Sequence, residues 1–338
     1  MVRMGAKWTP GGRTTGIGSL PHRSTKAAAA FAFAATSIPA IPTLPRRSPA
    51  EAMICQALVG VHGFDVGPYG SLAVNLSAVD PQAGIKSDLT DEAFRGTLAF
   101  LQLAQRSGYR GDVKWHFVGP VTLGIALARA GVPARQAFDV AVNAVRSHMD
   151  LLLDAVDLFI ADARQIVFLD EPSFFEVAEE NFFLPPDAAA DLISTALARI
   201  EPRAIAGVHC CADVNINQLL DTGPQVLSVP VTDGLLEYSA RLIRFLEDDG
   251  VIAWGAVPTS GPLPVTAERP WRVLSELWCE LVRRGADPLR LRHQALITPA
   301  CGLAAHSVSV AERLFTIASE VGTRVSDQSA AAHFAYGA

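Results

Sequence analysis

The chain has 338 residues, of which 50% are hydrophobic and 18% are charged, so a large core can form and global disorder is not expected. Its formal net charge is −6, from 28 Lys and Arg against 34 Asp and Glu, and this mild acidity argues against a nucleic-acid partner. The 5 cysteines are too few, and odd in number, for a disulfide framework, which favours the cytoplasm as the compartment.

The N-terminal segment contains an Ala-rich run that has to be distinguished from a targeting signal. Residues 1–13 are polar, basic and rich in glycine, and we expect them to form a loose lead-in. The run Ala27–Ala35 resembles the apolar core of a signal peptide but is too short to span a bilayer. Ser24 before it is a typical helix N-cap, and a strand-like run, Thr15–Leu20, precedes both. We therefore predict a helix over Ser24–Ala35 rather than a cleaved leader, and no membrane segment.

Eight short apolar runs, each bounded by Gly, Pro or polar residues, indicate strands of a parallel sheet that is covered on both faces. The predicted strands are Thr15–Leu20, Ile38–Leu44, Val113–Val118, Gln165–Leu169, Ala204–His209, Val226–Val231, Val251–Val257 and Ala295–Thr298. Longer amphipathic stretches alternate with these strands. The predicted helices are Ser24–Ala35, Pro49–Val61, Asp91–Arg106, Ala134–Ala163, Pro186–Ile200, Leu235–Asp248, Pro270–Arg284 and Ser307–Val321.

This alternation predicts an α/β fold, a (β/α)8 TIM barrel in a single domain over residues 14–330, followed by a tail over 331–338. The spacing is uneven, because the gap from Pro45 to Val113 holds more than one helix, and Gly67–Leu76 fits either a loop or an extra strand. A doubly wound open sheet is therefore an alternative. No glycine-rich phosphate loop follows a strand, so nothing in the sequence supports nucleotide binding.

The polar residues that could carry chemistry follow predicted strands, where the functional groups of parallel barrels gather. Gly119–Thr122 follows the third strand, Asp170 and Glu171 the fourth, and further groups follow the first, fifth and eighth. Each motif alone has a simpler explanation: Gly-Pro forms turns, Asp-Glu-Pro can end a strand and start a helix, and a single His or Cys is often a core residue. Because all of them fall on one predicted rim, a shared active site is the better interpretation.

His209, Cys211 and Cys301 are the most informative of these residues. His209 and Cys211 are two positions apart, so their side chains point to the same side of a strand, and Cys301 follows the eighth strand. One imidazole and two thiols form a soft ligand set that suits zinc, and three protein ligands with an open fourth position are typical of catalytic zinc sites. Zinc binding removes the proton of a thiol, so such a site can hold a substrate thiol as a nucleophile at neutral pH.

With these motifs, the sequence resembles the cobalamin-independent methionine synthase family, in a short form with only the catalytic barrel. The superfamily also holds uroporphyrinogen decarboxylases and methylcobamide-dependent methyltransferases. The matching pieces run through nearly the whole chain and are Thr15–Pro21, Ile41–Pro45, Gly119–Thr122, Leu169–Pro172, Val208–Cys211 and Thr298–Leu303. The resemblance implies a (β/α)8 barrel and methyl transfer to homocysteine to give methionine.

For the metal, the resemblance implies Zn²⁺ held by His209, Cys211 and Cys301. Cys210, which points the other way on a strand, would be structural. The family often adds a Glu after the next strand, but the run over 226–233 has no carboxylate at the expected place. The fourth position would then be open or filled by water.

For the substrate, the resemblance implies that backbone and hydroxyl groups of Ile17, Gly18 and Ser19 receive the carboxylate of homocysteine. Asp170 would be the catalytic residue that pairs with the amino group of the substrate. Glu171 is either a second partner in the substrate site or a charge at a helix start, and the sequence favours neither interpretation.

For the methyl donor, the sequence departs from the full-length members of the family. Those members carry a second barrel that helps to bind a polyglutamylated folate, and an acid/base His after a late strand. This chain has room for the catalytic barrel alone, and the corresponding run, Ile252–Thr259, contains no His. Transfer from a folate nitrogen needs that nitrogen protonated, whereas the cobalt of a methylcorrinoid leaves with the electron pair. Both absences favour methylcobalamin on a corrinoid protein over methyltetrahydrofolate.

Two alternatives remain open. A uroporphyrinogen-decarboxylase-like enzyme would need no metal but an Arg-rich cleft, for which Arg23, Arg46 and Arg47 are the candidates near the rim. A non-catalytic zinc- and thiol-binding partner of a corrinoid protein would use the same metal ligands without turnover. The sequence does not determine whether a further histidine lines the pocket; the candidates are His22, His116 and His306.

Overall fold

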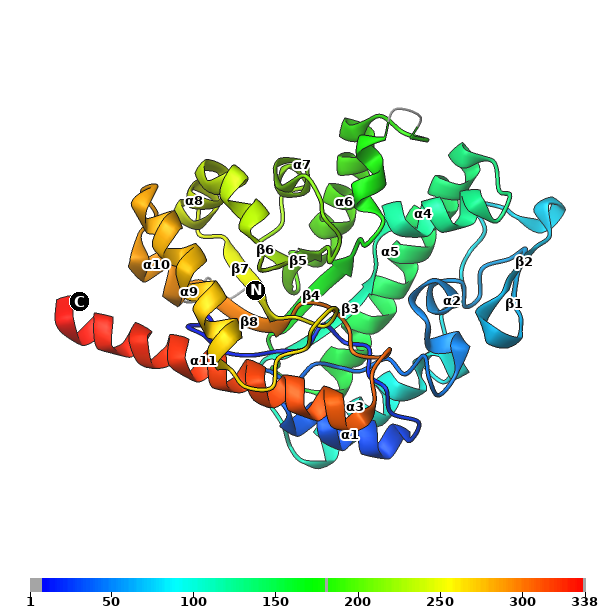
Figure 1. The fold of residues 1–338 in the computed structure, drawn as a ribbon. Helices are drawn as coiled ribbons and strands as arrows, with labels where there is room; N and C mark the ends of the chain where they lie inside the picture. Colours follow the sequence, from blue (N-terminus) through cyan, green and yellow to red (C-terminus); the bar gives the residue numbers. More distant parts are fainter. Residues whose placement is uncertain (1–7, 180–181, 337–338) are drawn as a thin grey trace.

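The computed structural model describes residues 8–179 and 182–336 and shows helices around a curled parallel sheet (Figure 1). The sheet has the order β3-β4-β5-β6-β7-β8, and all neighbouring strands are parallel. The strands are β3 (Val113–Val118), β4 (Gln165–Asp170), β5 (Ile205–His209), β6 (Val226–Pro230), β7 (Val251–Val257) and β8 (Ala295–Pro299). The boundaries of β3 and β7 are those predicted, and each of the others differs by one residue at one end.

Two extended segments close this sheet into a ring, at the places predicted for the first and second strands. Their parallel bridges join Thr14 to Ile297 of β8, Ser19 to Thr43, and Ala40 to Lys114 of β3. The ring therefore runs from β8 through residues 14–19 and 38–43 to β3, which gives eight strand positions. The open doubly wound sheet is excluded by this closure.

Helices cover the outside of the ring. They are α1 (Thr25–Ala34), α2 (Met53–Ala57), α3 (Arg95–Arg106), α4 (Pro120–Arg129), α5 (Ala134–Phe159), α6 (Pro186–Ile200), α7 (Ile216–Asp221), α8 (Ser239–Glu247), α9 (Glu268–Arg283), α10 (Pro288–His293) and α11 (Val308–Tyr336). Helices α4, α7 and α10 were not predicted from the sequence. The ambiguous region 67–76 belongs to an antiparallel hairpin of β1 (Phe64–Val66) and β2 (Leu72–Val74).

Five predicted helices differ clearly in extent from the observed ones. Helix α3 begins at Arg95 instead of Asp91 and α8 at Ser239 instead of Leu235, each after a 3-10 turn. The stretch predicted as a helix from Pro49 is a 3-10 turn followed by the short helix α2, because Ala52 between them is extended. The helix predicted to end at Ala163 ends at Phe159, because Ile160 has left helical geometry, with φ −128° and ψ 79°. Helix α11 continues well past the predicted end at Val321.

Alternate residues of the strands face two different cores. The outward residues pack under the helices in the large core, as Val167 and Leu169 of β4 do. The inward residues form a smaller cluster that fills one half of the barrel, with Ile166 and Phe168 among its members. The parity of the strands places Lys114, His116, Asp170, His209 and Ser228 inward as well. The barrel interior is thus apolar in one half and polar toward the carboxyl ends of the strands.

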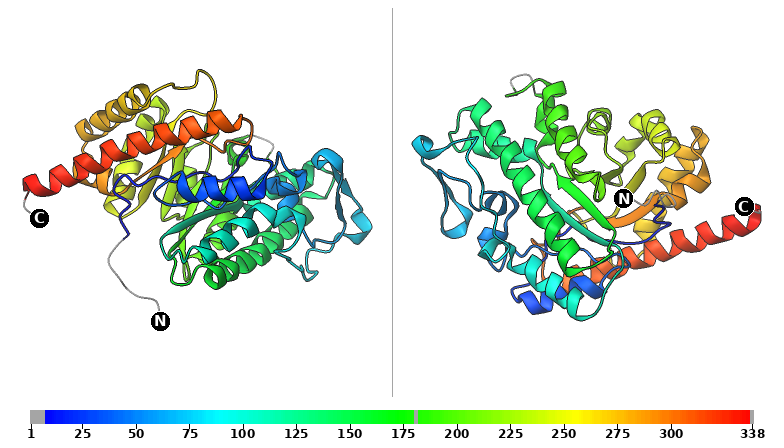
Figure 2. Two further views of the ribbon diagram at one scale, coloured as in Figure 1. Left: turned by 90° about the horizontal axis from the view of Figure 1, so that it is seen from below. Right: turned by 180° about the vertical axis from the view of Figure 1, so that it is seen from behind.

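The N-terminal end of the described chain lies against the barrel, whereas the C-terminal end of α11 projects beyond it (Figure 2). The N–H of Gly12 donates to Ala295 O of β8, although residues 1–7 of the predicted lead-in lie outside the described residues. Helix α11 runs along α1, where the ring of Phe315 meets that of Phe31 edge-on at 5.4 Å between centroids (Figure 2). The predicted domain boundaries at residues 13 and 330 stay predictions.

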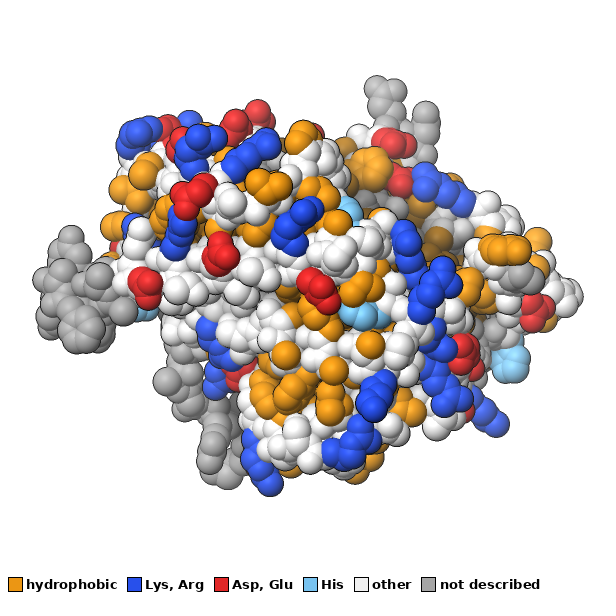
Figure 3. All heavy atoms as spheres, turned by 60° about the horizontal axis from the view of Figure 1, so that its bottom comes forward, with side chains coloured by type: hydrophobic (Ala, Val, Ile, Leu, Met, Phe, Trp, Pro, Cys, Tyr) orange, Lys and Arg blue, Asp and Glu red, His pale blue; other side chains and the backbone are white. Residues whose placement is uncertain are grey.

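The surface seen from the side of these two helices carries charges of both signs. Lys and Arg side chains form a loose band toward the right of the view, with Asp and Glu side chains scattered over the same face (Figure 3). Among the described residues, no helix combines the length and the apolar character needed to cross a bilayer.

Candidate metal centre

His209 is the inward residue at the carboxyl end of β5, where it pairs in register with Asp170 of β4 and Ser228 of β6. Its Nδ1 lies 2.9 Å from Ser228 Oγ, and the residue is 3% exposed. Its Nε2 is buried and has no hydrogen-bond partner among the described residues. A histidine held at one ring nitrogen with the other free is the arrangement that metal-ligating imidazoles show.

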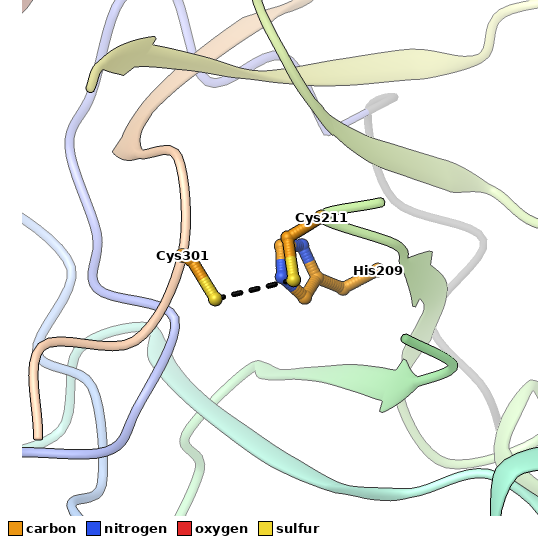
Figure 4. Close-up of side chains that lie close together, drawn as sticks. All are labelled: His209, Cys211 and Cys301. Atoms are coloured by element: carbon orange, nitrogen blue, oxygen red, sulfur yellow. Dashed lines mark hydrogen bonds between the residues drawn. The ribbon is translucent and has the colours of Figure 1, made fainter. Parts of the chain in front are cut away.

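Two thiols meet His209 at this rim, from the loops that follow β5 and β8 (Figure 4). The ligand atoms of His209, Cys211 and Cys301 all lie within 4.8 Å of one another, and the two sulfurs are 3.2 Å apart. The hydrogen bond from the Cys301 thiol lowers the pKa of Cys211 against the effect of burial. The same bond and burial together raise the pKa of Cys301. The two sulfurs thus lie close enough together for one cation to bind both.

This donor set fits a zinc ion. An unpartnered buried imidazole nitrogen and two adjacent half-buried thiols offer one nitrogen and two sulfur ligands. In the described part of the chain, no carboxylate joins them, and Asp233 is exposed at the start of a 3-10 turn. Cys210 lies in the outer core, where burial raises the pKa of its thiol to about 12, in keeping with a structural role. The cluster could therefore hold zinc through three protein ligands.

Asp170 lies beside this cluster but is bound to a residue that the sequence analysis left unplaced. Its Oδ2 is 2.6 Å from Nδ1 of His116, on the inward face of β3. Its Oδ1 is buried and has no partner among the described residues. Burial raises the pKa of Asp170, but the neighbouring side chains of His116, His209 and Lys114 outweigh it, and the pKa is lowered overall. A carboxylate with one free oxygen thus faces the barrel interior.

Glu171 has both carboxylate oxygens bound to the backbone at the start of α4. Oε1 accepts from Val121 N at 2.9 Å and Oε2 from Thr122 N at 2.6 Å. Burial raises the pKa of this side chain to about 7. The two bonds favour the helix-start interpretation over a contact with substrate, because both oxygens are directed at backbone N–H groups of α4.

The segment Ile17–Ser19 passes over the polar end of the barrel with its carbonyls bound and its amides free. Ile17 O accepts from Lys114 Nζ, Gly18 O from Thr43 N, and Ser19 O from Leu303 N. No described residue accepts a hydrogen bond from the N–H groups of residues 17–19. Free backbone donors in a buried segment are suited to a carboxylate, as the sequence analysis expected of these three residues.

The other two histidines left open by the sequence lie elsewhere. His22 is buried against the ring of Phe31, 5.1 Å away, and burial lowers its pKa. Nε2 of His306 lies 2.9 Å from Thr259 O, which joins the loops after β8 and β7. Of these three, only His116 contacts a predicted site residue through a side-chain hydrogen bond.

Of the inward residues Lys114, His116 and Ser228, sequence reasoning missed Lys114 and Ser228 and left the place of His116 open. Each interrupts a strand that is otherwise apolar, and the first two are separated by one residue, so they share a face of β3. A polar residue at alternate positions of a buried parallel strand was the available signal. Burial lowers the pKa of Lys114 to about 7, and its Nζ lies 4.5 Å from the ring centre of Phe168.

The comparisons with known proteins concern the fold. No protein-family model matches the chain, and no curated protein matches its sequence. The fold is similar to the solved structure of a B12-independent methionine synthase from Shewanella sp. W3-18-1, in complex with selenomethionine, with a TM-score of 0.61. The similarity covers 94% of this chain and 98% of that chain at 15% sequence identity. The predicted (β/α)8 class, and the predicted resemblance at the level of the fold, are confirmed.

Proposed function

We propose that the protein is a zinc-dependent methyltransferase that transfers a methyl group to a thiol, and that the thiol is homocysteine. The observation that carries this proposal is the convergence of His209, Cys211 and Cys301 at the carboxyl end of a methionine-synthase-like barrel. These residues would hold Zn²⁺ through Nε2 and two sulfurs. The bound ion would lower the pKa of a substrate thiol so that it is a thiolate at neutral pH.

The geometry around the three ligands supports zinc binding. Ser228 fixes the ring of His209 through Nδ1, so that Nε2 is the nitrogen directed at the sulfurs. The Cys301 thiol donates to the Cys211 sulfur, so the two sulfur ligands already lie close enough to bind one ion. His209 is buried and the two thiols are half-buried, so the ligands are partly shielded from water.

An amino-acid substrate is supported by groups of opposite character beside the cluster. Free amides of residues 17–19 would receive the carboxylate, and Asp170 Oδ1, which has no partner, would receive the ammonium group. Both groups are buried, so a ligand that lacked either charge would leave a polar atom unsatisfied.

We propose a methylcorrinoid, held by a corrinoid protein, as the methyl donor. The run Ile252–Thr259 offers no acid to a departing folate nitrogen. His306 reaches this run only through its bond with Thr259 O. We also propose the cytoplasm as the compartment, because the cysteine ligands must stay reduced.

The decarboxylase alternative has less support. Arg46 donates to Ala305 O, and Arg47 is bound to Glu51 and Glu92. Two of the three arginines that would have to receive substrate carboxylates are therefore already engaged.

The test of the proposed function is metal analysis followed by a methyl-transfer assay. The purified protein is expected to hold one zinc per chain and to convert homocysteine to methionine with methylcobalamin, faster than with methyltetrahydrofolate. Cys301→Ala is expected to lose zinc and at least about 100-fold in activity, because a zinc site with two protein ligands is rarely retained. Cys279→Ala removes an exposed thiol of α9 and is the matched control. Absence of zinc, or full activity in Cys301→Ala, would reject the proposal.

A further inference from the structure

His116 sits between the two predicted substrate-binding elements. Its imidazole lies directly under Gly18, so closely that a Cβ on that glycine would be 2.1 Å from ring atoms Cδ2 and Nε2. Gly18 also has a φ of +146°, where side chains are disfavoured. The segment Ile17–Ser19 thus rests on this ring, and Lys114, two residues earlier on the same face of β3, donates to Ile17 O.

The same imidazole ring is hydrogen-bonded to the carboxylate of Asp170. Nδ1 of His116 and Asp170 Oδ2 are 2.6 Å apart, and the two side chains are 7% and 4% exposed. This bond occupies one of the two carboxylate oxygens and fixes the rotation of the carboxyl group. The second oxygen, Oδ1, is left buried without a partner among the described residues. A buried carboxylate oxygen without a donor is costly, so the site is completed by a ligand that brings one.

We infer that His116 is the positioning residue for amine recognition: it binds Oδ2 of Asp170 and so presents Oδ1 alone to the ammonium group of the substrate. The inference rests on the proposed function, since it assumes that the ligand is an amino-acid thiol. His116 itself does not touch the ammonium group; it acts through Asp170. Nε2 of its ring lies 3.5 Å from Thr43 Oγ1, which supports the ring from the other side.

Three substitutions separate positioning from simple packing. His116→Asn keeps an N–H donor near the place of Nδ1, because the two nitrogens are the same number of bonds from Cβ. His116→Gln places its amide nearer to Nε2, and His116→Leu has no donor. His148 of α5 is the matched control, since it is a buried histidine whose Nδ1 binds Ser87 Oγ and whose Nε2 binds Ala57 O, away from the cluster.

The experiment measures, by calorimetry on the zinc-loaded protein, the affinities for L-homocysteine and for 4-mercaptobutanoate, which has the thiol and the carboxylate but no amine. The wild type is expected to prefer homocysteine. His116→Leu and His116→Gln are expected to weaken homocysteine binding by about 10- to 100-fold and to leave 4-mercaptobutanoate unchanged. His116→Asn should retain most of the preference, and His148→Gln all of it. The use of two variants without a donor at Nδ1 keeps the test valid if one fails to fold.

Action through Asp170 is tested by a double-mutant cycle. Asp170→Asn should abolish the preference, and adding His116→Gln to it should change little further. Additive losses, or an unchanged preference in His116→Gln, would overturn the inference while thiol binding remained intact. Failure of the proposed function would give a different result. The wild type would then bind neither thiol, or would bind both equally well without zinc. In that case the inference about His116 would be rejected as well.

Discussion

The polar side chains inside the barrel include two hydrogen-bonded pairs with different roles. Ser228 and His209 form one pair, which prepares the metal centre. His116 and Asp170 form the other, which prepares the substrate site, and Lys114 below them supplies a buried amine near the Asp170 carboxylate. Buried polar groups need partners. His209 Nε2 and Asp170 Oδ1 are two of the buried side-chain atoms without a partner among the described residues, and both face the polar end of the barrel, where they mark the place expected for ligands.

A first prediction concerns the support of the metal ligand. Ser228→Ala removes the hydroxyl that fixes His209 and leaves Nδ1 without a partner. We expect zinc affinity to fall by about 10- to 100-fold, as is usual when a group that orients a ligand is lost. Competition with a chromogenic chelator measures it. Ser275→Ala, which removes a hydroxyl of α9 that donates to Arg272 O, is the control. Equal affinities in the two variants would contradict the role of Ser228.

A second prediction concerns the contact between Gly18 and His116. Gly18→Ala is expected to reduce the free energy of unfolding by about 2–4 kcal/mol, because the new methyl group meets the imidazole and the backbone is strained. Urea denaturation measures the change. Gly131→Ala is the control, since Gly131 also has a positive φ, +100°, but nothing within 4 Å of an added Cβ. A loss no larger than that of the control would remove the steric part of the argument.

At the residue scale, the sequence predicted the site residues whose chemistry alone indicates a function. It missed those whose role depends on which residues lie beside them in the fold. Two cysteines and a histidine in a soft-ligand pattern indicate a metal by their chemistry and spacing alone. A serine or a lysine within a strand has no such signature, and only the pairing of β5 with β6 brings Ser228 to His209. The sequence also could not predict which oxygen of Asp170 is free. The other oxygen is bound by His116, which lies 54 residues away in the sequence.

At the scale of elements, six of the eight predicted strands match the observed strands almost to the residue. The first two predicted strands are irregular extended segments instead. Residues 14–19 and 38–43 form single bridges instead of continuous ladders. Proline has no N–H for a ladder, and Pro39 and Pro42 lie in the second segment, while Gly16 and Gly18 weaken the first. The helix α4 was not predicted, because Gly119–Thr122 was interpreted as a motif that follows the third strand, although Pro120 at the first helical position is a recognised start signal.

Helix α5 provides a third prediction, which concerns how the stability of the fold depends on pH. Its buried His148 bridges to Ser87 and to Ala57, and burial lowers its pKa to about 4 from a usual value of 6.5. The unfolded chain therefore binds a proton that the folded chain does not between these two values. Stability is complete above pH 6.5 and is lost as the pH falls toward 4, by up to about 3 kcal/mol.

Equilibrium denaturation at a series of pH values measures this dependence. His148→Gln has no group that titrates in this range, so its stability should fall less steeply between pH 6.5 and 4. If the variant and the wild type had parallel pH profiles, His148 would not be the group responsible.

For the whole molecule, the number and character of the strands were enough to predict the barrel, and closure of the ring brings distant residues together. Cys301 and Cys211 are 90 residues apart, yet their loops meet because β8 and β5 end at the same rim. One half of the interior is filled by apolar side chains such as Phe168, so that ligands can enter only from the polar half. What the sequence could not supply was the register, which decides which polar residues face each other.

The central claim is that His209, Cys211 and Cys301 bind one zinc ion together. Anomalous diffraction at the zinc edge, from crystals of the zinc-loaded protein, tests it most directly. The account predicts a single strong peak within bonding distance of His209 Nε2 and of both sulfurs. A peak at another place, or a zinc ion bound with the Cys301 sulfur out of reach in a fully folded molecule, would contradict it.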